Sequence, residues 1–208
     1  MGVFKYQSPE RALFGFGSVQ GIQDEIRSRK LTKALLVTGR DLADTAIVKN
    51  VIHALEAADT GYALFTDFKP NPTTNNVNQG SDAFIRNQCD FLISVGGGSA
   101  HDCAKAISVA AAGGGKIEDY TGADKSSRAY PLIAVTTTAG TGSECTSDYV
   151  VVDEAQNRKY GNSDRNVLPV LAVDDYELMM NMPASLTAGT GMDALTHAVE
   201  AYCSIDGA

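Results

Sequence analysis

The chain has 208 residues, of which 44% are hydrophobic, 20% charged and 7% aromatic. This is the composition of a packed globular protein, and it excludes a disordered, collagen-like or coiled-coil chain. Lys and Arg number 17 against 25 Asp and Glu, so the formal net charge is −8. Because such a surface repels phosphate groups as a whole, we expect no nucleic-acid partner and no membrane partner.

The cysteines and the N-terminus point to a reducing compartment. No two cysteines form a CxxC pair, which argues against a zinc or iron–sulfur site and predicts reduced thiols. The first six residues lack the apolar segment of a signal peptide, and no uninterrupted run of about 18 apolar residues occurs. The expected location is therefore the cytoplasm.

Apolar runs alternate with amphipathic ones along the first part of the chain. The amphipathic segments predict helices, the first of them capped by Ser18: residues 18–29, 41–58, 75–87 and 99–111. The apolar runs predict strands buried on both faces: residues 34–38, 63–65, 91–95 and 132–136. Strands separated by helices of this length predict a Rossmann-like α/β fold, with a parallel sheet covered by helices on both sides.

The pattern changes after Gly140. Residues 149–153, 158–160 and 170–173 predict three further strands, the first two joined by a hairpin loop, and we expect them to extend the sheet in antiparallel fashion. Residues 186–203 predict a helix with apolar side chains on several faces, which needs covering on most sides. We therefore expect two parts: a dinucleotide-binding α/β domain over residues 1–181, and over residues 182–208 the start of a helical, metal-binding domain that is cut short.

The segment FLISVGGGSAHDCAKAI, at residues 91–107, has the outline of a phosphate-binding turn. A predicted strand runs into three glycines, and Ser99 then opens a helix. Glycines let the backbone approach an anion closely, and the free N–H groups of the helix attract its charge. The segment is neither GxGxxG nor a P-loop. The alternative is a tight strand-to-helix turn that binds nothing.

A second loop, TTTAGTGSE at residues 136–144, also follows a predicted strand. Ligands of open α/β sheets bind beyond the carboxyl ends of the strands, so two such loops at one edge favour a nucleotide site. Threonine-rich turns can, however, satisfy only their own backbone, which is the alternative for this loop.

Asp193 and His197 stand four residues apart on the last predicted helix and therefore project from one face. A carboxylate and an imidazole suit Fe²⁺, with Zn²⁺ or Mn²⁺ as alternatives, and an open-site metal polarises an alcohol or carbonyl oxygen. A surface ion pair is the plainer interpretation of the same spacing. Of the other histidines, His53 is expected on a helix surface, and His101 lies in the predicted nucleotide domain.

Three segments in this order, GGGSAHDCAKAI, TTTAGTGSE and GMDALTHAVEAY, resemble the iron-containing (group III) alcohol dehydrogenases. FGFG at residues 14–17 and PNPT at residues 70–73 fit the same family, and the resemblance spans essentially the whole chain. It is most similar to the branch that acts on small diols and primary alcohols. The family implies an NAD(P)- and metal-dependent oxidoreductase that exchanges a hydride between the nicotinamide and a small alcohol or aldehyde.

The resemblance also implies roles for individual residues. Gly97, Gly98 and Ser99 would hold the pyrophosphate, and Asp193 and His197 would be the first two metal ligands. The implied cofactor-binding residues outside the glycine turn are Gly39, Arg40, Asn71, Asp102, Thr137, Thr138, Thr141, Asp148, Lys159 and Met179. The family commonly assembles through its N-terminal strands, so a homo-oligomer that pairs through residues 3–7 is expected.

The sequence departs from the family pattern in three places. The remaining two metal ligands, histidines in the family, do not occur before the chain ends, so we expect little activity from this chain alone. Gly39 and Arg40 stand where NAD-dependent relatives carry Asp; because glycine leaves room for a 2′-phosphate and arginine can pair with it, NADP is favoured over NAD. The alternative is that Asp41 contacts the ribose or caps the next helix.

The third departure concerns fine cofactor geometry. Ala100 replaces a common Pro at the start of the helix. Asp148 stands where relatives can carry Asn, and the carboxylate of Asp148 is less favourable to a phosphate than the amide of Asn. A stand-alone dinucleotide-binding module without catalysis remains the alternative function. A related lyase, or a glycerol-1-phosphate or polyol dehydrogenase of the same superfamily, is a third possibility. The Asp193/His197 pair argues against both.

Overall fold

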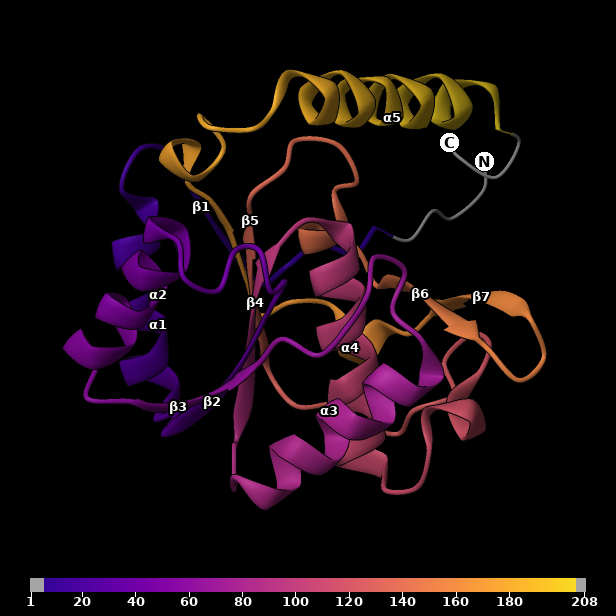
Figure 1. The fold of residues 1–208 in the computed structure, drawn as a ribbon, viewed down its shortest axis with the longest axis horizontal. Coiled ribbons are helices and arrows are strands. Elements are labelled where there is room, and N and C mark those ends of the chain that lie inside the picture. The colour runs from indigo at the N-terminus through magenta and orange to yellow at the C-terminus, as the bar shows by residue number, and fades with distance from the viewer. Residues whose placement is uncertain (1–5, 205–208) are drawn as a thin grey trace.

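Six strands form one parallel sheet in the computed structural model, which describes residues 6–204 (Figure 1). The strand order is β1-β8-β5-β4-β2-β3, and every neighbouring pair is parallel. The strands are β1 Arg11–Phe14, β2 Lys33–Thr38, β3 Gly61–Phe65, β4 Phe91–Gly96, β5 Leu132–Thr136 and β8 Leu171–Asp174. The predicted Rossmann-like α/β fold is confirmed.

Helices cover both faces of this sheet. The α-helices are α1 Ile22–Arg29, α2 Ala46–Ala57, α3 Thr74–Arg86, α4 Gly98–Gly113 and α5 Ala184–Cys203. Short 3₁₀ segments are η1 Ser18–Gly21, η2 Ile117–Tyr120, η3 Ser143–Cys145, η4 Arg165–Val167 and η5 Tyr176–Leu178. Helices α1 and α2 lie on one side and α3 and α4 on the other (Figure 1).

Alternation along the strands builds the two cores. On β4, Phe91, Ile93 and Val95 face α1 and α2, whereas Leu92 belongs to the cluster beneath α3 and α4. All four side chains are fully buried. Strands with apolar residues on both faces lie in the interior of a sheet, as β2, β4 and β5 do, so these three are predicted correctly. Residues 63–65 do form part of a strand, but the expectation that it is buried on both faces is wrong, because β3 is an edge strand and Leu64 is 49% exposed.

The prediction that the later strands extend the sheet in antiparallel fashion is wrong. Strands β6 Asp148–Asp153 and β7 Arg158–Ser163 pair antiparallel with each other as a separate two-stranded sheet, with the expected hairpin loop between them. β8 is parallel and lies between β1 and β5. The cause is burial, because Tyr149 and Val151 of β6 pack into the core beneath α3 and α4 and carry the hairpin away from the sheet.

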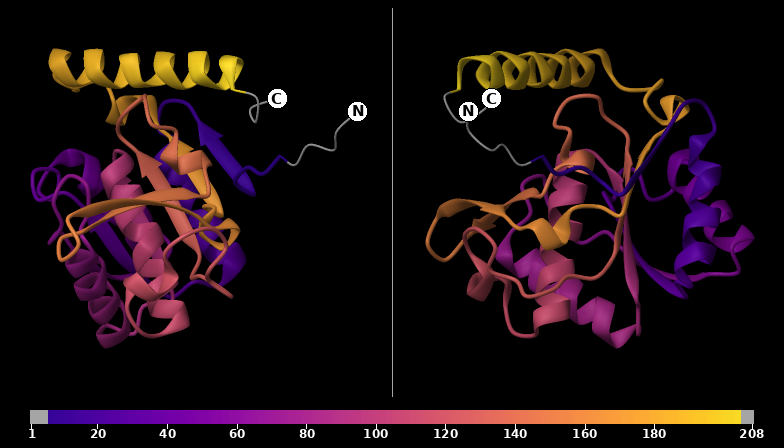
Figure 2. Two further views of the ribbon diagram at one scale, coloured as in Figure 1. Left: turned by 90° about the vertical axis from the view of Figure 1, so that its right-hand side faces the viewer. Right: turned by 180° about the vertical axis from the view of Figure 1, so that it is seen from behind.

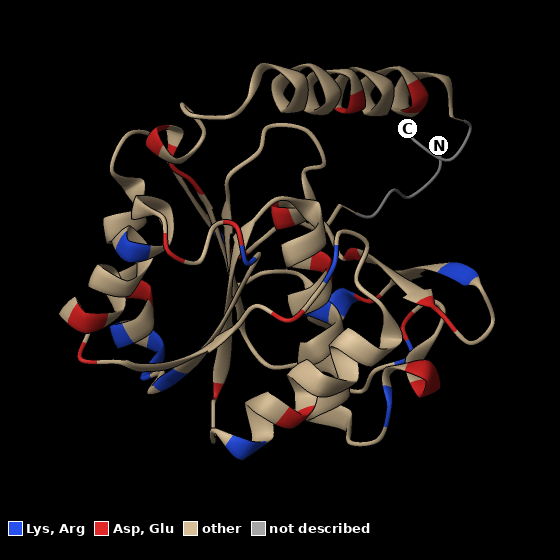
Figure 3. Ribbon diagram, in the orientation of Figure 1, with Lys and Arg blue, Asp and Glu red and all other residues tan. Residues whose placement is uncertain are grey.

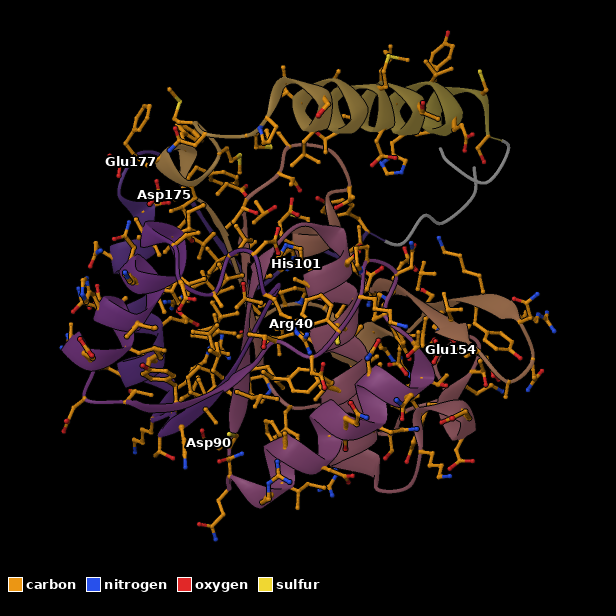
Figure 4. The ribbon with its side chains drawn as sticks, in the orientation of Figure 1. Arg40, Asp90, His101, Glu154, Asp175 and Glu177 are labelled. Atoms are coloured by element: carbon orange, nitrogen blue, oxygen red, sulfur yellow. The ribbon has the colours of Figure 1, made fainter. Side chains whose placement is uncertain are left out.

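The first helix also differs from its prediction. Ser18 does not cap it: residues 18–21 form η1, α1 begins at Ile22, and within the described residues the buried Ser18 hydroxyl has no hydrogen-bond partner. The cap comes instead from Asp175, beyond β8, whose carboxylate accepts from the Gly17 amide at 3.1 Å and the Val19 amide at 3.0 Å. Asp175 lies beside this turn in Figure 4.

Helix α5 lies across the end of the sheet at which the strands finish (Figure 2). None of its residues is buried, although Met192, Leu195 and Val199 are large and apolar. The prediction of a helix with apolar side chains on several faces is confirmed, and these side chains are exposed. No described helix combines the length and apolarity needed to cross a membrane.

Candidate functional site

The candidate site lies where β2 and β4 end. After β2 the chain continues to β3 at the edge of the sheet and then returns to the other side of β2 as β4. The chain therefore leaves β2 in one direction along the sheet and leaves β4 in the opposite direction, toward β5. Such a topological switch point leaves a crevice beyond the carboxyl ends of the strands. Gly39 follows β2 and the glycine turn follows β4, so both segments lie at this point.

The glycine turn is built for close approach to an anion. Gly96 has φ +152°, a conformation that side-chain-bearing residues avoid, and Gly97 is the N-cap of α4. The first N–H groups of a helix have no acceptor within the helix, and the dipole makes this end positive. Gly97, Gly98 and Ser99 thus present their backbone at the positive end of a 16-residue helix.

The second loop touches the glycine turn. A methyl group on Gly97 would lie 2.9 Å from Thr138 Oγ1, and one on Gly98 would lie 2.9 Å from Thr141 Cγ2. Thr137 donates its amide hydrogen to the Gly96 carbonyl over 3.0 Å. The two loops that the sequence singled out therefore form one surface, and glycine at residues 97 and 98 is what lets them meet.

Two more predicted residues join this surface through hydrogen bonds. The backbone N–H of Asn71 donates to Ser99 Oγ over 3.2 Å. Lys159 Nζ donates to the side-chain oxygen of Asn71, Oδ1, over 3.0 Å. Asn71 has φ +57°, which asparagine tolerates better than most residues. The PNPT segment and strand β7 are thus brought to the amino end of α4, and Lys159 supplies a cation there.

Asp102 is bonded within the protein through both of its carboxylate oxygens. Its Oδ1 accepts from Ser143 Oγ over 3.0 Å and its Oδ2 from the Val150 amide over 3.1 Å, so both oxygens are used within the protein. Burial raises the pKa of Asp102, opposed by nearby Lys105 and by these hydrogen bonds. Asp148 is exposed, and Met179 is half-buried in the turn after β8.

Arg40 does not lie free at the site. Its guanidinium forms an ion pair with the carboxylate of Asp67, which follows β3, the neighbouring strand. Gly39 is crowded by Asp41, whose Oδ1 would lie 2.6 Å from a methyl group on Gly39. Two carboxylates therefore stand beside the residues that were expected to receive a 2′-phosphate.

Asp193 and His197 lie on α5, with 3.7 Å between Asp193 Oδ1 and His197 Nε2, and both are partly exposed. Metal ligands at about 2.1 Å from one ion stand about 3 Å apart, so a small closure of this gap would let both bind the same ion. Within residues 6–204 no group of three or more such side chains comes together. The pair fits half of a divalent-metal site.

Helix α5 is tied to the second loop. A methyl group on Gly140 would lie 2.7 Å from both Cβ and the carbonyl oxygen of Thr190, so loop and helix are in direct contact. Helix α5, which carries Asp193 and His197, and the glycine turn consequently lie beyond the same end of the sheet (Figure 2).

Sequence reasoning missed two fully buried polar side chains on α4, His101 and Lys105. His101 Nδ1 lies 2.7 Å from Ser94 Oγ, its Nε2 has no partner among the described residues, and burial together with Lys105 lowers its pKa to about 3. Figure 4 places His101 inside the molecule, between α4 and the sheet. A charged residue in the otherwise apolar stretch CAKAI was the available signal for Lys105.

Two further acidic side chains lie near the strand ends. Glu144 and Asp174 each have a buried carboxylate oxygen without a partner in the described part of the chain, and burial raises the pKa of both groups. The ribbon of α5 in Figure 3 has red segments and no blue ones, because its Asp and Glu residues are Asp193 and Glu200 and it contains no Lys or Arg. Apart from Arg40, which is paired with Asp67, the groups here that could hold a phosphate are backbone N–H groups and Lys159 rather than a basic patch.

The sheet order, the switch point and the glycine turn place the chain in the class of Rossmann-like α/β proteins. A family model described as iron-containing alcohol dehydrogenase matches residues 9–176. The chain belongs to that family. Alcohol dehydrogenase 4 of Schizosaccharomyces pombe is 44% identical over 205 residues, which cover 98% of this chain and 49% of that protein.

A second relative and a solved structure are also similar to this chain. An NAD-dependent methanol dehydrogenase of Bacillus methanolicus is 42% identical over 93% of this chain and 51% of its own length. The crystal structure of a 1,3-propanediol oxidoreductase superposes with a TM-score of 0.96 at 39% identity, over 100% of this chain and 55% of that one. The chain thus spans about half the length of the relatives it matches.

Proposed function

We propose that this chain is the cofactor-binding portion of an NAD(P)- and metal-dependent alcohol dehydrogenase acting on a small primary alcohol or diol, or on the corresponding aldehyde. The observation that carries the proposal is the meeting of Gly97 and Gly98 with Thr138 and Thr141 at the switch point. Family membership and the alcohol dehydrogenase names of the relatives support the reaction type.

In this proposal the backbone amides of residues 97–99 bind the pyrophosphate, and Thr137, Thr138 and Thr141 contact the dinucleotide from the other side. Asn71 and Lys159 line the same surface, with Asp148 and Met179 at its margin. Asp102 acts indirectly, since one of its oxygens accepts from Ser143 at the end of the loop and the other from Val150 on β6. Residues 1–181 are the cofactor domain, and residues 182–208 belong to a helical metal-binding domain.

Asp193 and His197 would hold the metal, for which Fe²⁺ is proposed and Zn²⁺ or Mn²⁺ are alternatives, since a carboxylate and an imidazole suit all three ions. A divalent ion bound there would supply Lewis-acid polarisation of the substrate oxygen. Two side chains on one helix hold such an ion weakly, so the chain alone should have little dehydrogenase activity. The contact between Gly140 and Thr190 keeps the pair beside the cofactor loop.

NADP(H) is the proposed cofactor, with NAD(H) the alternative, because Gly39 leaves room for a 2′-phosphate and Arg40 can pair with one. The Arg40–Asp67 ion pair opposes this choice, since binding a 2′-phosphate requires Arg40 to exchange partners. Gly39→Asp should shift the preference toward NADH. An unchanged ratio of the two affinities would argue against the proposed NADP selectivity.

We propose a homo-oligomer in which N-terminal residues 3–7 pair with a second copy. Residues 3–5 lie outside the described part of the chain, and the structure shows β1 as an edge strand, paired within this chain with β8. Small alcohols and aldehydes are the proposed substrates, without a nucleic-acid or membrane partner, and the cytoplasm stays a prediction from the sequence.

The deciding experiment is a fluorescence titration of the purified chain with NADH and with NADPH at one salt concentration. Saturable binding of either dinucleotide supports the proposal without needing metal or substrate. Gly98→Val is the matched variant: its side chain would push against Thr141, and we expect binding to weaken while the chain stays folded. If a folded wild-type chain binds neither dinucleotide, the proposed cofactor site is wrong.

A further inference from the structure

Lys105 is the most completely buried cation in the described structure, with no exposed surface. It lies on α4, two turns after the glycine turn, in a stretch where its neighbours Cys103, Ala104, Ala106 and Ile107 are all buried. An ammonium group is costly to remove from water, so a lysine in such a place needs several acceptors in good geometry.

The acceptors of Lys105 all come from one segment, residues 143–148. Its Nζ donates to the Ser143 carbonyl and to the Asp148 carbonyl, both at 2.7 Å, to Ser143 Oγ at 3.1 Å and to Thr146 Oγ1 at 3.3 Å. None of these acceptors is a carboxylate. The ammonium therefore fastens the backbone at the end of the second loop to the side of α4.

A second bond from α4 reinforces this attachment. Asp102 lies three residues before Lys105 on the same helix, and its carboxylate accepts from Ser143 Oγ and from the Val150 amide. Ser143 Oγ is thus shared, since it donates to Asp102 and accepts from Lys105. One loop residue is held by an acid and a base from one helix face.

The attachment continues to the glycine turn. The Ser143 amide donates to Thr141 Oγ1 over 3.2 Å, and the Thr141 side chain is the group that lies against Gly98. A continuous series of contacts therefore runs from Lys105 through Ser143 and Thr141 to the amino end of α4. Without the hydrogen bonds from the Lys105 ammonium, the loop would lose the contacts that fix its distance from the pyrophosphate-binding amides.

We propose that Lys105 is a positioning residue: its ammonium group anchors residues 143–148 to α4 and thereby holds the threonine loop in the geometry that binds the dinucleotide, without touching the dinucleotide itself. This inference rests on the proposed function. It predicts that dinucleotide binding depends on the charge of a side chain that has no access to the ligand.

The charge of Lys105 is sensitive to pH in an accessible range. Burial lowers its pKa to about 8, opposed by Asp102, Asp148, Glu144 and Cys145. The titratable and charged groups that act on it are His101 and Asp102 from α4, Glu144 and Cys145 from η3, and Asp148 from β6. His101 has its pKa lowered to about 3 and Cys145 has its pKa raised to about 11, so neither titrates near pH 8.

Deprotonation removes the charge and one of the three donor hydrogens from Nζ, so the anchor weakens as the pH rises through about 8. We therefore expect the affinity of the chain for NADH or NADPH to fall across this range. Neutral methionine at residue 105 has no proton to lose, so a Lys105→Met variant should bind weakly at every pH and show no such fall.

The test combines two readouts on wild type, Lys105→Met and the control Lys49→Met, which removes a cation from the exposed face of α2. Fluorescence titration from neutral pH to about pH 9 gives dinucleotide affinity. Amide hydrogen exchange at one pH reports the order of residues 143–150 without any ligand. We expect about tenfold weaker binding and faster exchange in this segment for Lys105→Met, with β5 still protected and Lys49→Met like wild type.

The outcomes separate the two proposals. If amide hydrogen exchange of residues 143–150 is the same in Lys105→Met as in wild type, Lys105 does not anchor this segment. This holds whether or not the chain binds a dinucleotide. If wild type binds neither dinucleotide, the proposed function fails, and the exchange result alone still decides whether Lys105 holds the loop. Wild-type affinity that stays constant across pH 8 in a binding-competent chain overturns the dependence on charge.

A second variant covers the case in which Lys105→Met does not fold. Ser143→Ala removes the shared hydroxyl while leaving the ammonium and its backbone acceptors in place. We expect a smaller change in the same direction in both readouts. Exchange and affinity equal to wild type in a folded Ser143→Ala variant would overturn the proposed anchor.

Discussion

Arg40 and Asp67 form an exposed ion pair between the ends of β2 and β3, at the place where an adenine ribose would lie in the proposed complex. An exposed pair of this kind is worth at most about 1 kcal/mol, so a 2′-phosphate can compete for the arginine. The identity of the preferred dinucleotide therefore depends on Asp67 as well as on Gly39 and Arg40.

Asp67→Asn should raise the affinity for NADPH relative to NADH by about threefold to tenfold, because Arg40 is then free to pair with the 2′-phosphate. Parallel fluorescence titrations with the two dinucleotides measure the ratio. Asp82→Asn, on the exposed side of α3, makes the same charge change far from the site and serves as control. A ratio that does not move would mean that Arg40 has no part in the choice.

His101 gives the folded chain a specific sensitivity to acid. Its pKa is lowered to about 3 from an ordinary value of 6.5, chiefly by burial, so between these values the unfolded chain binds a proton that the folded chain refuses. The corresponding stability is complete above pH 6.5 and is lost as the pH falls. It amounts to about 2 kcal/mol between pH 6.5 and about pH 5.

His101→Gln should reduce this loss, since glutamine does not titrate and can still bond to Ser94. Urea unfolding at the two pH values measures it, and His53→Gln, on the exposed face of α2, is the matched control. If His101→Gln loses as much stability on acidification as wild type and the control, the acid sensitivity comes from other groups.

At the scale of elements, the packing of α3 on α4 depends on a glycine. A methyl group on Gly80 would lie 2.3 Å from Ile107 Cδ1, 2.7 Å from its Cγ1 and 3.2 Å from Phe65 Cε1. All three residues are buried, so these neighbours have little room to move. Glycine at residue 80 lets α3 approach the helix that carries the glycine turn.

Gly80→Ala should therefore lower the free energy of unfolding by about 1 kcal/mol, because overpacking outweighs the gain in helix propensity. Thermal melting measures the change. Gly189→Ala, on α5 with nothing within 4 Å of the added methyl, is the control and should not lower the melting temperature. A Gly80→Ala variant as stable as wild type would show that Ile107 repacks without cost.

At the scale of the whole molecule, the α/β part and helix α5 differ in how much apolar surface they bury. The sheet and its four covering helices share two buried cores, whereas α5 buries no residue and exposes about half or more of Met192, Leu195 and Val199. Apolar surface gathered on one helix is a site of association for whatever can cover it. The folding energy of the chain therefore resides in the α/β part.

A chain ending at residue 181 should keep the melting temperature of the full chain within about 2 °C and bind less of a dye specific for exposed apolar surface. Calorimetry and dye fluorescence measure the two effects, with the full chain as the reference. Unfolding of the shortened chain would show that α5 supports the core and would refute the proposed boundary at residue 181.

The sequence predicted the parts of the candidate site that depend on local backbone chemistry. The glycine turn, the threonine loop and the Asp193/His197 spacing are each contained in one short segment, so their character can be read without knowing the fold. Asp102 and Arg40 were expected to face a cofactor, and the structure engages both with partners 41 and 27 residues away. Partners at such separations leave no periodic signal.

The sequence by itself determined the α/β class, the main strands and helices, the two loops and the exposed apolar helix, because hydrophobic periodicity and glycine conformations act over a few residues. Only the tertiary structure decided that β8 inserts between β1 and β5, that Asp175 caps the turn at Gly17, and that Lys105 fastens the threonine loop. Each of these depends on which distant segments satisfy a buried polar group or an open strand edge, and that choice is made only when the whole core packs together.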